Sequence, residues 1–405
     1  MGTAASAAVM IPAMGFFARH LDTESFGLFT LVMAFVGYAS VLDGGFARAV
    51  VREIAQAGNQ MNRAERALGA AVVLVLGIGF IFGLLLWLLS ASLVNVIHVG
   101  DSLQLEAIEG FHWTALMIAP ILLSMVWMSP LEAKAQFASL NILRSFGYAT
   151  VFGCAVIAVY WMPTFSAATA GLLIGRMGMA LISFIACRQI MGKYLYPFCL
   201  DSAKRLFQFG RWLTVSSIIS PLMDSLDRFV LSAFSGASTV AFYAAPSEAI
   251  SKMLALPYSV SRALFPVLSK IEDGDKEKTR KIATVLQLCI GLFLVMLVML
   301  FGDQMMGLWL GEKYATASGM LIKILIWGVL FNAMATIPYT ELQAMGHSKI
   351  TAQVHLIEVI PFISFLLVMT YEFGAIGTAI AWVVRTLIDW ILQSYFCRKI
   401  KRQFH

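Results

Sequence analysis

Apolar blocks of roughly 20 residues alternate with short polar segments from one end of the chain to the other. A helix of that length crosses the hydrocarbon core of a bilayer, so the pattern predicts an all-α, polytopic membrane protein. We expect about twelve transmembrane helices, at residues 2–19, 26–46, 68–95, 111–129, 146–162, 165–187, 209–233, 239–261, 283–302, 319–339, 352–371 and 374–396. The more polar segment REIAQAGNQMNRAER (52–66) predicts a helix that lies at the membrane surface.

Composition supports a membrane protein rather than a soluble one. Of the 405 residues, 60% are hydrophobic and only 13% are charged, whereas a soluble domain carries about 25% charged residues. The polar segments between the apolar blocks are short, so we expect no separate soluble domain.

The sequence lacks the motifs of several enzyme classes. It has no GxxxxGK[ST] loop, which argues against direct use of ATP, and no HExxH or GxSxG pattern. The five cysteines and six histidines are scattered, so neither a disulfide framework nor a metal site is expected. We expect a transporter with no catalytic residues and no cofactor. A membrane glycan polymerase is a weaker alternative, because such an enzyme needs a larger outer loop.

The distribution of lysine and arginine predicts the orientation of the chain. With the N-terminus in the cytoplasm, 22 of the 29 basic residues fall in cytoplasmic loops or in the C-terminal tail, and only Arg19 and Lys313 fall on the opposite side. This bias follows the positive-inside rule and places both termini in the cytoplasm. The net charge of +6 then reflects topology and anionic inner-leaflet lipid, so nucleic acid is not an expected partner.

The two halves of the sequence resemble each other. Residues 26–54 align with residues 240–268, and residues 165–176 align with residues 373–385. Each half holds six expected spans, an even number, so the repeats are parallel and enter the membrane from the same side. We therefore expect an N-terminal six-helix bundle (1–190), a cytoplasmic linker (191–208) and a C-terminal six-helix bundle with the tail (209–405). Two such bundles would face each other across a central cleft that opens to either side of the membrane.

The second half carries charges inside its expected spans. Each charge costs about 2.5–3.5 kcal/mol at the centre of a bilayer, so such residues face a bundle interior or an aqueous cavity. One helical face holds Ser217, Asp224 and Arg228, with Asp227 just beside it. The following span carries Glu248, Lys252 and Ser259 in a second polar stripe.

Two interpretations of these charges stay open. In the first, Asp224–Arg228 and Glu248–Lys252 are local ion pairs that hold helices together. In the second, Arg228 and Lys252 attract an anionic substrate, while Asp224, Asp227 or Glu248 binds a coupling proton or cation.

Other intramembrane charges give weaker signals. Arg176 and Arg385 occupy equivalent positions in the two halves and suit either a structural or a substrate-binding role. Asp389 lies one turn beyond Arg385 and is a candidate partner for it. Glu358 and His355 are three residues apart on one helix, and Glu358 is a further candidate for ion coupling.

Four blocks of the sequence are similar to those of a known family. The segment ARHLDTESFGLFTLVMAFVGYASVLDGGFARAVVREIA resembles the first conserved block of polysaccharide-transport proteins. The segment from FGRWLTVSSIISPLMDSLDRF to RALFPVLSK resembles the middle block of that family. LQAMGHSKITA and FGAIGTAIAWVVRTLIDW resemble its last two blocks. The similarity covers nearly the whole chain, although the family usually begins with a basic tail where this sequence has MGTAASAAVM.

The family is that of the O-antigen-type flippases for lipid-linked oligosaccharides, in the superfamily that also includes multidrug antiporters and lipid II flippases. The resemblance implies a two-lobed protein of twelve helices in the bacterial inner membrane. It implies that undecaprenyl-pyrophosphate-linked repeat units move from the cytoplasmic to the periplasmic leaflet, coupled to an ion gradient. The polymerase and the chain-length regulator of the same pathway are then candidate partners. An antiporter of small cationic compounds is the alternative within the superfamily.

Overall fold

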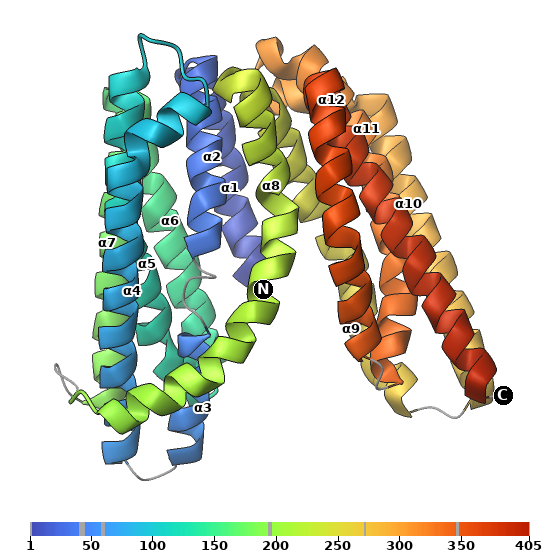
Figure 1. Cartoon of the computed structure of the whole chain (residues 1–405), viewed down its shortest axis with the longest axis horizontal. Coiled ribbons are helices and arrows are strands. Elements are labelled where there is room, and N and C mark those ends of the chain that lie inside the picture. The colour runs from blue at the N-terminus through green and yellow to red at the C-terminus, as the bar shows by residue number, and fades with distance from the viewer. Residues whose placement is uncertain are drawn as a thin grey trace. The chain divides into compact units, whose positions relative to one another are not determined.

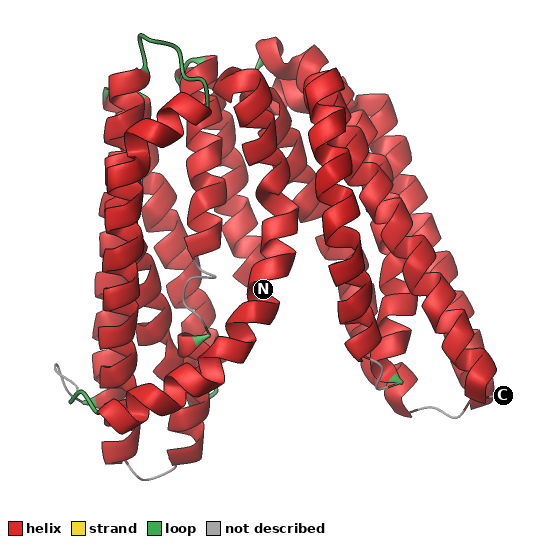
Figure 2. Ribbon diagram, in the orientation of Figure 1, coloured by secondary structure: helices red, strands yellow, loops and turns green. Residues whose placement is uncertain are grey.

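The computed structural model describes residues 2–39, 45–57, 61–192, 197–270, 273–345 and 348–404. Within these ranges the ordered elements are all α-helices (Figure 2), as the sequence predicts. Their bounds are α1 (Gly2–His20), α2 (Thr23–Ala39), α3 (Phe46–Ala57), α4 (Met61–Val96), α5 (Gln104–Ala133), α6 (Phe137–Trp161), α7 (Phe165–Met191), α8 (Leu200–Met253), α9 (Ala255–Lys270), α10 (Asp273–Leu310), α11 (Glu312–Ala344) and α12 (Ser348–Phe404).

Eight helical stretches of the described chain are long and apolar enough to cross a membrane. They are Met61–Val96, Gln104–Ala133, Phe137–Trp161, Phe165–Met191, Leu226–Phe265, Glu277–Leu310, Glu312–Ala344 and Gln353–Ile400. A shorter apolar helix, Thr23–Gly37, matches the second expected span. The chain is therefore a multi-pass membrane protein. The fifth and sixth expected spans are separated at Met162 and Pro163, between α6 and α7.

Two expected elements differ in detail from the structure. The span expected at 239–261 lies within the apolar stretch Leu226–Phe265, although α8 ends at Met253 and α9 begins at Ala255 inside it. Pro257 has no N–H to donate to the carbonyl of Met253, which favours a break at this point. The surface helix expected at 52–66 is instead divided between α3, which begins at Phe46, and the start of α4. The buried residues of α3 lie on one side of it and include Phe46, Val50 and Ile54.

Two glycines turn long helices back on themselves. Gly236 interrupts α8 with φ 76° and ψ 168°, and Gly374 interrupts α12 with φ 56° and ψ −134°. These backbone conformations are essentially restricted to glycine. The two halves of α12 then lie side by side (Figure 1), and the hydroxyls of Thr370 and Thr378 meet at 3.0 Å near the turn. α8 and α12 therefore each supply two of the expected spans.

The chain folds into two compact units, Met1–Leu226 and Asp227–His405. In the first unit α5 packs against α4 and α7, and α7 packs against α6. Glycines allow the closest approach: a Cβ added at Gly175 would lie 2.4 Å from the Cα of Val151. Phe17 and Phe29, both fully buried, place their ring centroids 4.4 Å apart in the core of this unit.

The beginning of α7 is held by two side chains. Thr164 is the N-cap residue, and its side chain accepts a hydrogen bond from the backbone N–H of Ala167. From α5, Glu106 Oε1 accepts from the N–H groups of Phe165, at 2.5 Å, and Ser166, at 3.2 Å. These N–H groups have no partner within the helix, so the carboxylate satisfies them and favours the positive end of the helix dipole.

In the second unit α11 packs between α10 and α12, and α9 packs against α10 and α11. Trp382 of α12 covers Gly328 of α11 so closely that a Cβ there would lie 2.1 Å from its ring. Phe331 and Trp390 stack with their ring centroids 6.3 Å apart. These contacts fix the second half of α12 against α11 and so position the polar side chains of α12.

Candidate functional site

The turn at Gly236 brings together a group of charges, which we name the α8 charge cluster: Asp227, Arg228, Tyr243, Glu248 and Lys252. Arg228 Nη2 lies 3.2 Å from Glu248 Oε2 and 3.4 Å from the hydroxyl of Ser247. Glu248 and Arg228 are 20 residues apart in the sequence and meet only because the two halves of α8 run antiparallel.

Glu248 is shared between two cations. Its Oε1 lies 2.8 Å from Lys252 Nζ, while its Oε2 faces Arg228. The pair Glu248–Lys252 expected from the sequence is thus observed, but it is half of a larger arrangement. The Lys252 side chain is 37% exposed, the Glu248 side chain 19% and the Arg228 side chain 10%. The lysine is therefore the most accessible charge of the cluster.

Asp227 is buried and bound on both of its carboxylate oxygens. Oδ2 accepts a 2.5 Å hydrogen bond from the hydroxyl of Tyr243, and Oδ1 accepts from the backbone N–H of Arg228 at 2.7 Å. Asp227 is 1% exposed and Tyr243 is fully buried. This arrangement suits a structural role better than the expected role in ion coupling, because both carboxylate oxygens already have partners in the protein.

The other residues predicted from the sequence are more dispersed. The side chains of Ser217 and Asp224 lie outside the described residues, so the expected pair Asp224–Arg228 stays a prediction. Ser259 lies on α9, and its hydroxyl donates to the carbonyl of Leu256. Arg176 belongs to α7 of the first unit, where its Nε is buried and makes no hydrogen bond to any described residue.

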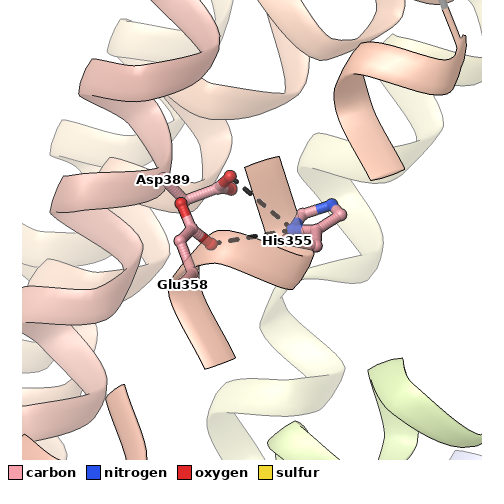
Figure 3. Close-up of side chains that lie close together, drawn as sticks. All are labelled: His355, Glu358 and Asp389. Carbon is pink, nitrogen blue, oxygen red and sulfur yellow. Dashed lines mark ion pairs between the residues drawn. The ribbon is translucent and has the colours of Figure 1, made fainter. Parts of the chain in front are cut away.

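A second group, the α12 cluster, consists of His355, Glu358 and Asp389 (Figure 3). His355 Nδ1 lies 3.7 Å from Glu358 Oε2 and 3.9 Å from Asp389 Oδ1. One ligand atom from each of the three residues lies within 4.8 Å of the others, which is close enough to hold a metal ion. Figure 3 shows both carboxylates directed toward the same imidazole from the two halves of α12.

Glu358 is the buried carboxylate of this group that lacks hydrogen bonds. It is 5% exposed, and neither of its buried carboxylate oxygens has a hydrogen-bond partner in the described structure. The buried Gln393 also leaves Oε1 without a partner, while its Nε2 donates to Asp389 Oδ1 at 3.2 Å. A buried carboxylate without hydrogen bonds is costly unless it is protonated or neutralised by a cation. The oxygen-rich donor set suits a proton or a hard cation.

On the sequence Asp389 is a candidate partner of Arg385, but in the structure it contacts His355 and Gln393. The Arg385 guanidinium instead lies 5.1 Å from the centroid of the Phe362 ring. Tyr243 was missed as a partner of Asp227 for a related reason. Both contacts join the two halves of a helical hairpin, and the partners in such a contact are not equally far from the glycine. Arg228 lies 8 residues before Gly236, whereas Glu248 lies 12 residues after it.

Sequence comparison gives a family and a relative of similar length. The family model described as polysaccharide biosynthesis protein matches residues 5–272. A protein of Shigella flexneri described as "Putative O-antigen transporter" is 35% identical over 396 residues, which cover 97% of this chain and 94% of that protein.

Two solved structures share the fold. An inward-facing multidrug resistance MATE family transporter of the MOP superfamily has a TM-score of 0.80 and 16% identity, over 97% of this chain and 94% of that chain. The lipid II flippase MurJ, in an inward closed conformation, has a TM-score of 0.80 and 15% identity, over 98% of this chain and 86% of that chain. At these identities the similarity concerns the fold, which a multidrug transporter and a lipid II flippase share.

Proposed function

The chain belongs to the polysaccharide biosynthesis protein family, and on that premise we propose that it is a flippase for lipid-linked oligosaccharides. Its substrate is an undecaprenyl-pyrophosphate-linked repeat unit, of O-antigen or a related glycan, which it moves from the cytoplasmic to the periplasmic leaflet. The observation that supports this proposal most strongly is the 35% identity, along 97% of the chain, to the Shigella flexneri protein described as "Putative O-antigen transporter".

The α8 charge cluster suits the anionic part of such a substrate. Arg228 and Lys252 share the single carboxylate of Glu248, and Lys252 keeps more than a third of its side chain exposed. A pyrophosphate can displace Glu248 from Lys252, because both are oxygen acceptors and the lysine ammonium has three donors. Arg228 would then hold Glu248 in place. The lipid tail can stay in the bilayer while the head group crosses by alternating access.

The α12 cluster suits the coupling ion. Glu358 and Asp389 lie on spans, face one imidazole and include buried oxygens that lack hydrogen bonds. Binding a proton or a hard cation there removes the cost of a buried carboxylate that lacks hydrogen bonds. Since that cost differs between occupied and empty states, binding can bias a two-state conformational equilibrium. We assign coupling to Glu358 and Asp389 rather than to Asp227.

The bacterial inner membrane is the site of this activity, with both termini in the cytoplasm. That orientation rests on the distribution of basic residues along the sequence. The polymerase and the chain-length regulator of the same pathway are the proposed protein partners, because they use the translocated repeat unit.

An antiporter for small cationic compounds is the second candidate, since a multidrug transporter has the same fold. Such a substrate favours an acidic binding site, whereas Lys252 and Arg228 both flank Glu248 in this chain. Drug susceptibility of a deletion strain tests this candidate directly.

Complementation tests the proposed function. The chain is expressed in a Gram-negative strain that lacks its own O-unit flippase and carries the matching glycan genes. We expect the O-antigen ladder to return on a lipopolysaccharide gel. If no matched glycan restores the ladder although the protein is present in the membrane, and the deletion strain becomes drug-sensitive, the antiporter is supported instead.

A further inference from the structure

A basic cavity lies where α3, α4 and the beginning of α8 meet, within the first unit. It has a volume of about 710 Å³, and its lining includes Asn62, Arg63, Arg66, Cys199, Ser202 and Arg205. A neighbouring cavity of about 420 Å³ shares Arg63 and Arg205 and adds Arg52 and Glu53. The two cavities share two arginines, and we name them together the arginine pocket.

Positive charge exceeds negative charge in this pocket. Arg63 lies 3.0 Å from Glu53, and Arg205 lies 3.8 Å from the same carboxylate, so two guanidinium groups share one acid. Arg66 has no hydrogen bond or ion pair with any residue in the described parts of the chain. With Arg52, four arginines face Glu53 and Asp201.

The start of α8 adds donors to the same place. α8 begins at Leu200, and Cys199 precedes it with its carbonyl bound to the N–H of Ala203. Arg205 Nη2 donates to the hydroxyl of the buried Ser202 at 2.9 Å, which aligns the guanidinium with the helix start. Hydrogen bonds from Ser202, first from its backbone, lower the pKa of the Cys199 thiol. These hydrogen bonds come from the start of α8 and not from the arginines.

We infer that the arginine pocket binds a phosphate-bearing anion. Arginine presents paired N–H donors whose geometry matches two phosphate oxygens, and Arg66 is available for such a contact. The anion is either the head group of an anionic phospholipid or a soluble phosphate compound, and both present the same chemistry. α3 packs against α4 and α5 with a buried face that includes Phe46, Val50 and Ile54, and its Arg52 and Glu53 line the pocket.

The inference does not depend on what the protein transports. The pocket belongs to α3, α4 and the segment that leads into α8, whereas the charge clusters assigned to transport lie in the second unit. Anion binding would fix the start of α8 against α3 and α4 by replacing part of the role of Glu53.

Alkylation of Cys199 provides the test. The full-length protein is placed in nanodiscs of phosphatidylcholine, with or without phosphatidylglycerol, and the rate of reaction with N-ethylmaleimide is followed by peptide mass spectrometry. A third series adds sodium pyrophosphate to phosphatidylcholine nanodiscs at constant ionic strength. A bound anion disfavours the thiolate and covers the thiol, so we expect Cys199 to react several-fold more slowly. Glutathione added to the same samples serves as the reference, because Cys289, although exposed on α10, lies within the apolar stretch Glu277–Leu310.

Substitutions separate the pocket from general surface charge. R66Q removes the unpaired arginine without breaking a described ion pair, and we expect it to abolish most of the slowing. R144Q is the matched control, because Arg144 pairs with Glu132 at 3.4 Å in the same unit but does not line the pocket. Slowing by phosphatidylglycerol alone identifies a lipid head group, and slowing by pyrophosphate alone identifies a soluble anion. Equal rates in all wild-type series, or equal slowing in R66Q and R144Q, would overturn the inference.

Discussion

Arg228 Nη2 lies 3.2 Å from Glu248 Oε2, and the two residues lie on opposite sides of the chain reversal at Gly236. Glu248 is therefore the common partner of a buried guanidinium and of the more exposed Lys252. This relationship changes what each charge in α8 is expected to do. A local pair can be inverted without loss, whereas a shared carboxylate cannot be replaced by a cation without bringing like charges together.

We expect the double substitution E248K/K252E to impair both folding and flipping. It restores an attractive pair between positions 248 and 252, but it places a lysine against Arg228 in a partly buried setting. We expect low membrane levels and no O-antigen ladder in complementation. The matched control is E277K/K281E: Glu277 is likewise shared, between Arg280 and Lys281, but it is 46% exposed. Exposed pairs contribute about 0–1 kcal/mol, so that variant should behave as wild type. Wild-type behaviour of E248K/K252E would show that Arg228 does not depend on Glu248.

The two cations of the cluster should respond differently to truncation. K252A leaves Glu248 paired with Arg228, so we expect normal membrane levels but reduced flipping, measured as a shorter or fainter O-antigen ladder. R228A removes a side chain that is only 10% exposed, and we expect it to lower the amount of folded protein in the membrane as well. Full flipping by K252A at normal protein level would exclude Lys252 from substrate binding.

The spans of the chain were predictable, and the contacts between charges on different helical segments were not. Apolar blocks about 20 residues long reveal a helix because the bilayer sets that length. The pair Glu248–Lys252 was predictable because it lies within one helical turn. Arg228–Glu248 and His355–Asp389 depend on where α8 and α12 reverse. The expected span ends already place the reversals near Gly236 and Gly374, but the backbone angles at these glycines, which decide which side chains meet, do not follow from hydrophobicity.

Glu358 and Asp389 are expected to carry ion coupling. E358Q keeps the shape of the side chain but removes its charge, so the site no longer needs a proton or a cation. We expect E358Q and D389N to lose stimulation by an imposed sodium or proton gradient in vesicles, while the protein level stays near normal. D303N is the control, because Asp303 belongs to a different pair, 2.6 Å from Lys323, and lies outside the α12 cluster. If E358Q and D389N both kept their stimulation by the gradient, the coupling site would not be the α12 cluster.

Glu106 is expected to stabilise the first unit through the start of α7. E106Q can still accept a hydrogen bond from Phe165 or Ser166, but it loses the negative charge at the positive end of the helix. We expect the free energy of unfolding to fall by about 0.5–2 kcal/mol, because the hydrogen bonds are weaker and the interaction with the helix dipole is lost. Thermal unfolding in detergent measures it. E109Q, at an exposed position on the same helix, should change the midpoint little. Equal unfolding midpoints for E106Q and E109Q would show that Glu106 does not stabilise the start of α7.

Gly374 is expected to tolerate no side chain, for a reason that involves the backbone alone. A Cβ at this position would have only the hydroxyl of Ser235 nearby, at 3.7 Å, so alanine meets no steric obstacle. Its φ of 56° with ψ of −134° is nevertheless strained for any residue with a Cβ, at a cost of about 1–3 kcal/mol. We expect G374A to lower the unfolding midpoint and also to weaken gradient stimulation, because the turn sets the contact between His355 and Asp389.

The control is G153A, whose Cβ would meet nothing within 4 Å and whose position lies inside a regular helix. That change should leave stability equal or raise it by up to about 1 kcal/mol, since alanine favours helix more than glycine does. If G374A matched G153A in both measurements, the glycine turn would not be what holds the α12 cluster together.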